Sequence, residues 1–231
     1  MNLFICNSSI GRKLVMSITG VCLVLFLTFH MCMNLVALFS ADAYNMVCEF
    51  LGANWYALIA TIILAAGFIL HIVYAFWLTI QNRTARGARA YEVSSSPKEV
   101  DFASKNMLAL GIMVFAFLGL HLWDFWAKMQ LIEILHKCGI EVSTDDALAK
   151  ATDGIAHIQA AFSDPIHVIL YLVGLAALWF HLSHGFWSAF HTMGLNNKIW
   201  FNRLKAISTV YATLLVAGFA VVLIVFYAQS L

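Results

Sequence analysis

The chain has 231 residues, of which 62% are hydrophobic and 11% charged, and its formal net charge is +1. A soluble domain is nearer half apolar and a quarter charged, so this composition excludes an ordinary soluble enzyme or binding domain. The apolar residues are gathered into long runs, which predict an all-α polytopic membrane protein.

Five apolar runs are long enough to cross a bilayer, which takes about 20 residues. We expect them, within a single transmembrane domain, at 14–39, 55–80, 107–127, 165–193 and 206–227. The fourth has a clear start signal, because Asp164 can cap a helix and Pro165 suits the first helical position. The long connector at 128–164 contains an amphipathic segment at 129–136.

Lysine and arginine are divided unevenly between the two sides that five spans would create. One side receives ten of them and the other three. The ten are Arg12, Lys13, Arg83, Arg86, Arg89, Lys98, Lys105, Lys198, Arg203 and Lys205; the three are Lys128, Lys137 and Lys150. Since cytoplasmic segments carry the excess of basic residues, we expect the N-terminus in the cytoplasm and the C-terminus outside.

Each of the first four runs contains a histidine well inside it: His30, His71, His121 and His181. A histidine inside a membrane span is costly and usually has a partner. Two neutral imidazoles from different helices are also what a b-type haem iron needs as axial ligands.

The expected orientation sorts these four histidines by depth. The first and third spans run outward, which places His30 and His121 in the outer half of the membrane. The second and fourth run inward, which places His71 and His181 in the inner half. At 1.5 Å per residue the two depths differ by roughly 10 Å. The sequence therefore predicts an outer pair and an inner pair, forming a haem-binding bundle.

Two alternatives stay open at this point. His181, His184 and His191 lie on one face of the fourth span, so His184 is an alternative to His181 as the inner ligand. In a protein without haem, the same histidines would serve as polar contacts between helices or as a proton relay.

Four segments, in order, carry a family resemblance. They are FLTFHMCMNLVALFSADAYN around His30, FILHIVYAFWL around His71, FAFLGLHLWDF around His121 and DPIHVILYLVGLAALWFHLSHGFWSAF around His181. With the opening IGRKLVMSITG, they make the chain resemble the single-subunit, di-haem cytochrome b of succinate dehydrogenases and fumarate reductases. The resemblance covers nearly the whole chain, including the five-span layout.

The resemblance implies two haem b groups, held by His30 with His121 and by His71 with His181. The family ligand in the fourth span is the histidine of F-H-x-S-x-G-x-W, here His181, and His184 falls at a variable position. It also implies a quinone, usually menaquinone, near the outer haem, and a multi-pass location in the bacterial cytoplasmic membrane.

The partners that the resemblance implies are a flavoprotein and an iron–sulfur protein on the cytoplasmic face, besides lipid and quinone. A dimer of such complexes is compatible with it, and no nucleic acid is expected. The chain would belong to a succinate:quinone oxidoreductase without acting on succinate alone. The nearest rival is the cytochrome b of another respiratory complex, of the hydrogenase or formate dehydrogenase type.

Two acids are candidates for handling quinol protons. Glu49 follows His30 by nineteen residues, in a place similar to that of a glutamate in some members of the family. Asp124 lies one turn beyond His121. A carboxylate at the membrane edge can accept a proton as a quinol loses electrons, although a solvated loop acid would look the same.

Overall fold

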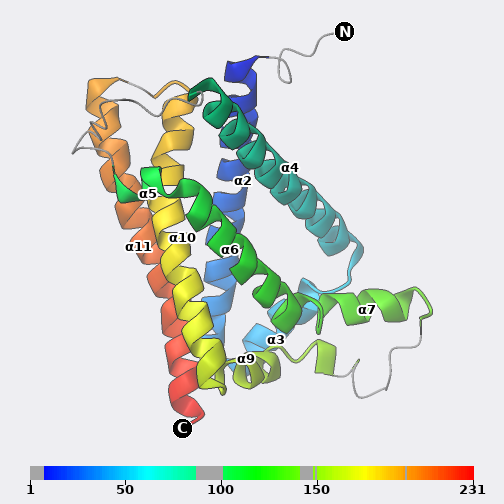
Figure 1. Cartoon of the computed structure of the whole chain (residues 1–231). Helices are drawn as coiled ribbons and strands as arrows, with labels where there is room; N and C mark the ends of the chain where they lie inside the picture. The colour runs from blue at the N-terminus through cyan, green and yellow to red at the C-terminus, as the bar shows by residue number, and fades with distance from the viewer. Residues whose placement is uncertain (1–7, 87–100, 141–147, 149, 196) are drawn as a thin grey trace.

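The structure is a computed structural model that describes residues 8–86, 101–140, 148, 150–195 and 197–231. Its regular elements, within those residues, are all helices. Five of them are long and apolar enough to cross a membrane, which confirms the all-α class with five candidate spans (Figure 1). They are α2 (Ser9–Leu35), α4 (Trp55–Arg86), α6 (Met107–His121), α10 (Pro165–Thr192) and α11 (Lys198–Gln229). Arg89 and Lys98, which entered the charge count, lie outside the described residues.

The start of three long helices is set by a capping side chain and not by the first residue of the apolar run. The Asp164 carboxylate accepts a hydrogen bond from the Ile166 amide at 3.0 Å, and Pro165 takes the first position of α10, so the predicted start is confirmed. Ser8 and Asn197 cap α2 and α11 in the same way. These two helices therefore begin before the apolar runs at 14–39 and 206–227, because a side-chain cap can extend a helix into polar sequence.

Helix α10 lies at the centre of the bundle and packs against α11, α6 and α2. Close approach depends on small residues: Gly218 of α11 faces Met31 of α2, and Gly174 of α10 faces the ring of Phe117 in α6. The fully buried Ser208 of α11 donates to the carbonyl of Leu182 in α10 at 3.1 Å. Polar bonds of this kind and small-residue contacts are the usual means by which helices associate in membranes.

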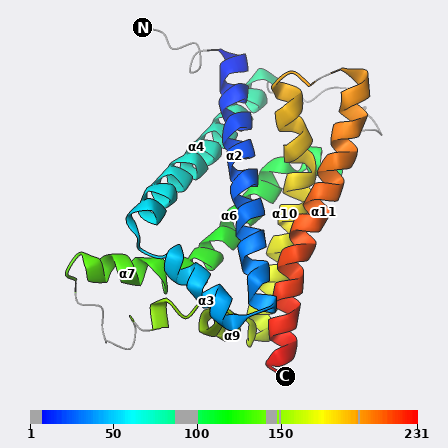
Figure 2. The ribbon, with the colours of Figure 1, turned by 180° about the vertical axis from the view of Figure 1, so that it is seen from behind.

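Helix α4 has a different place. It packs against α2 near one end of the molecule and leads away from the bundle toward the other end, as both views show (Figures 1 and 2). At that far end it meets α7 (Gln130–Lys137), where Thr61 donates to the Gln130 side chain at 3.0 Å. The predicted amphipathic segment at 129–136 is confirmed as α7, which runs crosswise to the long helices (Figure 1).

Short helices close the same end of the bundle. They are η1 (Val36–Leu38), α3 (Ala41–Phe50), the π-turn η2 (Leu122–Trp126) and α9 (Gly154–Phe162), whereas α5 (Phe102–Lys105) lies near the opposite end (Figure 1). Asn45 joins α3 to α9, since its amide donates to Asp153 at 3.0 Å and its oxygen accepts from the Ile155 amide at 3.1 Å. We call this closed end the α3 end.

The contact between α6 and α10 supplies a stability prediction. A Cβ added at Gly174 would overlap the Phe117 ring, and overpacking of this kind costs about 1–3 kcal/mol. Gly174→Ala is expected to lower the thermal unfolding midpoint of the detergent-solubilised protein. Gly119→Ala, in α6, is the control, because a Cβ there would meet nothing within 4 Å. Equal midpoints for the two variants would contradict this packing.

Candidate functional site

Two histidines from different helices meet toward the α3 end. His30 of α2 and His121, the last residue of α6, have ring centroids 5.6 Å apart and an interplanar angle of 81°. Phe26 stacks on the His30 ring at 5.4 Å, and Phe219 of α11 lies at 5.6 Å from it. The structure thus brings His30 and His121 together, and aromatic side chains border the pair.

The other two histidines meet closer to the opposite end. His71 of α4 and His181 of α10 have ring centroids 6.4 Å apart and an interplanar angle of 66°. The structure thus also brings these two histidines together. Four helices thus contribute one histidine each, and the fold brings them together two by two.

The separations suit a metal ion between the rings. An imidazole nitrogen binds a metal at about 2 Å, so the ring centroids of two opposite ligands lie roughly 6 Å apart. Among the described residues, no group of three or more His, Cys, Asp or Glu side chains could hold a metal ion. Two-histidine sites therefore fit a metal that brings its remaining ligands with it, as haem iron does with its porphyrin nitrogens.

A hydrogen bond orients His71 and selects its tautomer. The Thr19 hydroxyl oxygen lies 3.2 Å from Nδ1 of His71, and when the hydroxyl donates to the Val15 carbonyl at 2.9 Å this oxygen accepts from Nδ1. With the proton on Nδ1, the free lone pair is on Nε2. Metal-binding histidines are usually held in this way by a second group that fixes the ring and raises its basicity.

In α10, His181 rather than His184 faces His71. The His184 ring contacts Trp187, with centroids 4.9 Å apart. Nδ1 of both His181 and His184 is buried and has no hydrogen-bond partner within the described part of the chain. Buried polar nitrogens usually have a partner, so both atoms fit a site that accepts a further group. The geometry favours His181, and His184 lies beside it as the alternative.

Glycines face both imidazoles of the His71–His181 pair. A Cβ at Gly20 of α2 would lie 3.4 Å from Cε1 of His71, and one at Gly111 of α6 would lie 3.6 Å from Cε1 of His181. Each ring is thus bordered by a residue without a side chain, contributed by another helix. Small residues at these points leave space for a flat group beside the imidazoles.

Asn34 and Tyr44 support His30 and were not found from the sequence. The Asn34 amide donates to the His30 carbonyl at 2.8 Å and lies 3.4 Å from Nδ1 of the ring. The Tyr44 hydroxyl of α3 donates to the Asn34 side chain at 3.2 Å. Asn34 follows His30 by one helical turn, which is a spacing that could have pointed to it, whereas the reach of Tyr44 depends on how α3 folds back.

The two candidate acids have different surroundings. Glu49 is exposed at the end of α3 and lines a surface hollow together with Asp153. Asp124 is only 3% exposed and accepts a hydrogen bond from the Tyr171 hydroxyl at 3.1 Å. The Tyr171 ring is in turn 6.3 Å from the His121 ring, centroid to centroid, so Asp124 is the acid that the fold links to the His30–His121 pair.

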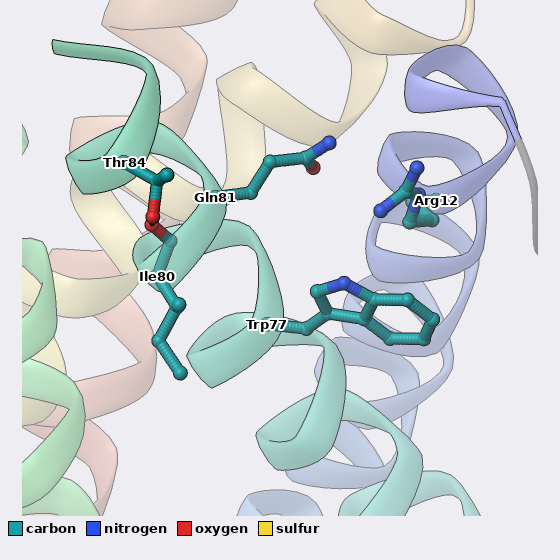
Figure 3. Close-up of a pocket in the computed structure, with 5 residues that line it drawn as sticks. All are labelled: Arg12, Trp77, Ile80, Gln81 and Thr84. Carbon is teal, nitrogen blue, oxygen red and sulfur yellow. Dashed lines mark hydrogen bonds between the residues drawn. The ribbon is translucent and has the colours of Figure 1, made fainter. Parts of the chain in front are cut away.

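A hollow of about 420 Å³ lies between α2 and α4, on the side of His71 away from the α3 end. Figure 3 shows its lining, in which the Arg12 guanidinium stands over the Trp77 ring at 5.0 Å from the centroid. Ile80, Gln81 and Thr84 complete it. The cation–π contact joins α2 to α4 about two turns beyond His71 and so helps to keep His71 beside Gly20.

No protein-family model matches the chain, and no curated protein or solved structure does either. The functional conclusion therefore depends on the residues and their arrangement.

The junction of α3 and α9 yields a prediction about thiol chemistry. Burial is the main cause that raises the pKa of the Cys48 thiol, to about 11 from 9.0. Because the thiolate is the reactive form, Cys48 at pH 8 is expected to react with iodoacetamide roughly a hundredfold more slowly in the folded protein than after denaturation. Mass spectrometry of timed samples measures both rates. Equal rates would show that α9 does not cover this thiol.

Proposed function

We propose that this chain is the membrane-anchor, di-haem cytochrome b subunit of a quinone-linked succinate dehydrogenase or fumarate reductase. The observation that carries the proposal is the pairing of His30 with His121 and of His71 with His181, on four different helices. A polar contact between helices needs any hydrogen-bonding partner, and the Thr19 hydroxyl already supplies one to His71. A second imidazole at a metal-bridging distance is what a metal with two histidine ligands requires.

In this proposal His30 and His121 hold an outer haem b, and His71 and His181 an inner one. Each group, when bound, would carry single electrons and offer no open axial position to a substrate. Thr19 holds His71 in the tautomer whose Nε2 can bind iron, and the aromatic rings around His30 and His121 exclude water from the outer site. The chain's own task is therefore to hold two ligand pairs at fixed depths.

The orientation belongs to the same proposal. Ten of the thirteen lysines and arginines lie in segments assigned to the cytoplasm, so the flavoprotein and iron–sulfur partners would dock there and the α3 end would face outward. A membrane quinone, of the menaquinone type that is usual in the family, would bind near the outer pair. The expected location is the bacterial cytoplasmic membrane.

The first test is haem content combined with paired substitutions. The purified protein is expected to carry two b haems per chain in a pyridine haemochrome assay. His30→Ala and His121→Ala should each remove the same redox transition, and His71→Ala and His181→Ala should each remove the other. The reason is that each haem needs both of its axial ligands.

Several outcomes would overturn this assignment. Fewer than two haems per chain would exclude the di-haem model and favour a haem-free membrane protein. Loss of one common transition in His71→Ala and His121→Ala would show that the pairs are wrong. Retention of both haems in His181→Ala, with loss of one in His184→Ala, would make His184 the ligand. Co-purification with hydrogenase or formate dehydrogenase subunits would identify the rival complex.

The Thr19 hydroxyl provides a finer test of the inner site. Thr19→Val keeps the shape of the side chain but removes the acceptor for Nδ1 of His71, and loss of such a supporting bond typically weakens metal binding about 10–100-fold. We expect inner haem to be lost during detergent titration while the outer haem is retained. Thr79→Val is the matched control, since the Thr79 hydroxyl donates to the Ala75 carbonyl of its own helix and has no other hydrogen bond among the described residues. Equal haem retention in both variants would contradict the role of Thr19.

A further inference from the structure

Asp124 is a buried acid on an unusual turn of helix. It belongs to η2, where the backbone bond from the Ala127 amide to the Leu122 carbonyl, 2.8 Å long, spans five residues. Such π-turns are rare and occur frequently at functional sites. The turn lies directly after His121 and places the Asp124 carboxylate against α10.

Three groups surround this carboxylate. One oxygen, Oδ2, accepts from the Tyr171 hydroxyl at 3.1 Å. The other, Oδ1, lies 3.5 Å from the Lys128 ammonium and 3.8 Å from Nε2 of His167. The last distance is too long for a direct hydrogen bond, and one bridging water or a small rotation of the ring closes it.

His167 connects the buried acid to the surface. Its Nδ1 lies 2.6 Å from Oδ2 of Asp164, and 35% of its side chain is exposed. The hydrogen bond from His167, followed by that from the Ile166 amide, lowers the pKa of Asp164, so this carboxylate stays ionised and holds a proton on Nδ1. In the neutral ring the lone pair is then on Nε2, on the side of Asp124.

We propose that Asp124 and His167 form the path along which protons pass between the quinol site and the outer surface, with Asp164 as the positioning residue that sets the tautomer of His167. The proposal rests on the proposed function, because it needs a quinol that reacts near the outer pair. It assigns to Asp124, rather than to Glu49, the proton-accepting role.

The proton balance is simple in the direction of quinol oxidation. A hydroquinone becomes a quinone by losing two electrons, which leave one at a time toward the haems and the docked subunits, and two protons. Ionised Asp124 accepts each proton in turn, passes it from its carboxyl group to Nε2 of neutral His167, and is ready for the next. The imidazolium releases this proton from Nε2 to water, to which the ring is partly exposed, and so regains the lone pair for the second proton. Quinone reduction uses the same steps in reverse.

Other charged groups around the path are few among the described residues. Lys128, 49% exposed, places its ammonium 3.5 Å from Oδ1 of Asp124. His157 of α9 lies near Lys128; burial is the main cause that lowers the pKa of His157, and the ammonium contributes. Neither group joins Asp124 to the surface as directly as His167 does, since Lys128 has no lone pair to accept a proton while it is charged.

The test uses the purified complex with its flavoprotein and iron–sulfur partners. Turnover of a water-soluble naphthoquinol, coupled to fumarate reduction, is measured against pH for Asp124→Asn and His167→Gln. Each is expected to lower turnover at least about tenfold, because an acid–base group of this kind contributes on that scale or more. The pH profile of His167→Gln should also differ from that of the wild type, because a glutamine side chain cannot relay a proton. Haem content and fumarate reduction driven by reduced viologen should be unchanged.

Asp42→Asn is the matched control, because Asp42 is an exposed acid of α3 at the same end. A second readout is the redox-induced infrared difference spectrum, in which a carboxyl band of the wild type should disappear in Asp124→Asn. If turnover and pH profile of both variants equal those of Asp42→Asn, the path is wrong although the proposed function stands. If the wild type has no haem or no quinol activity, the proposed function itself fails. Should Asp124→Asn not assemble, His167→Gln decides alone.

Discussion

An imidazole inside a bilayer must have a partner, because hydrocarbon offers its nitrogens nothing to bond with. The arrangement of this molecule follows from satisfying that requirement four times. His30 faces His121 and His71 faces His181, and each pair has its own supporting group: Thr19 beside His71, and Asn34 beside His30. The partners come from different helices, so the requirement can be met only if those helices are held in a fixed register.

The position of each long helix along its neighbours is set by two kinds of contact, one within the bundle and one at α4. The α2, α6, α10 and α11 helices pack closely through residues such as Gly174 and Ser208. Helix α4 packs instead against α2, where Arg12 contacts Trp77, and meets α7 through the Thr61–Gln130 bond. The histidine that α4 carries, His71, lies in the contact with α2, where Thr19 bonds to it.

The two ends of the bundle are chemically unlike each other. The α3 end is closed by short helices and contains a buried acid that contacts α10 through Tyr171 and His167. The opposite end carries most of the basic residues and the hollow beside Arg12 and Trp77. Such an asymmetry suits a protein whose two ends have different partners, as in the function proposed above: a quinone and its protons at one end and soluble subunits at the other.

The sequence alone determined the five long helices, the start of α10 and the amphipathic α7, because apolar length, helix capping and periodicity are local properties of the chain. It also led to the histidine pairs, since depth in a membrane follows from counting residues along each span. It could not find Thr19, Tyr44 or His167 as supporting groups, nor separate Asp124 from Glu49. Those assignments depend on which face of each helix meets its neighbour and on how the short helices fold back. Only the packing of the whole bundle determines which helix faces meet, because this packing brings together residues that are far apart in the chain.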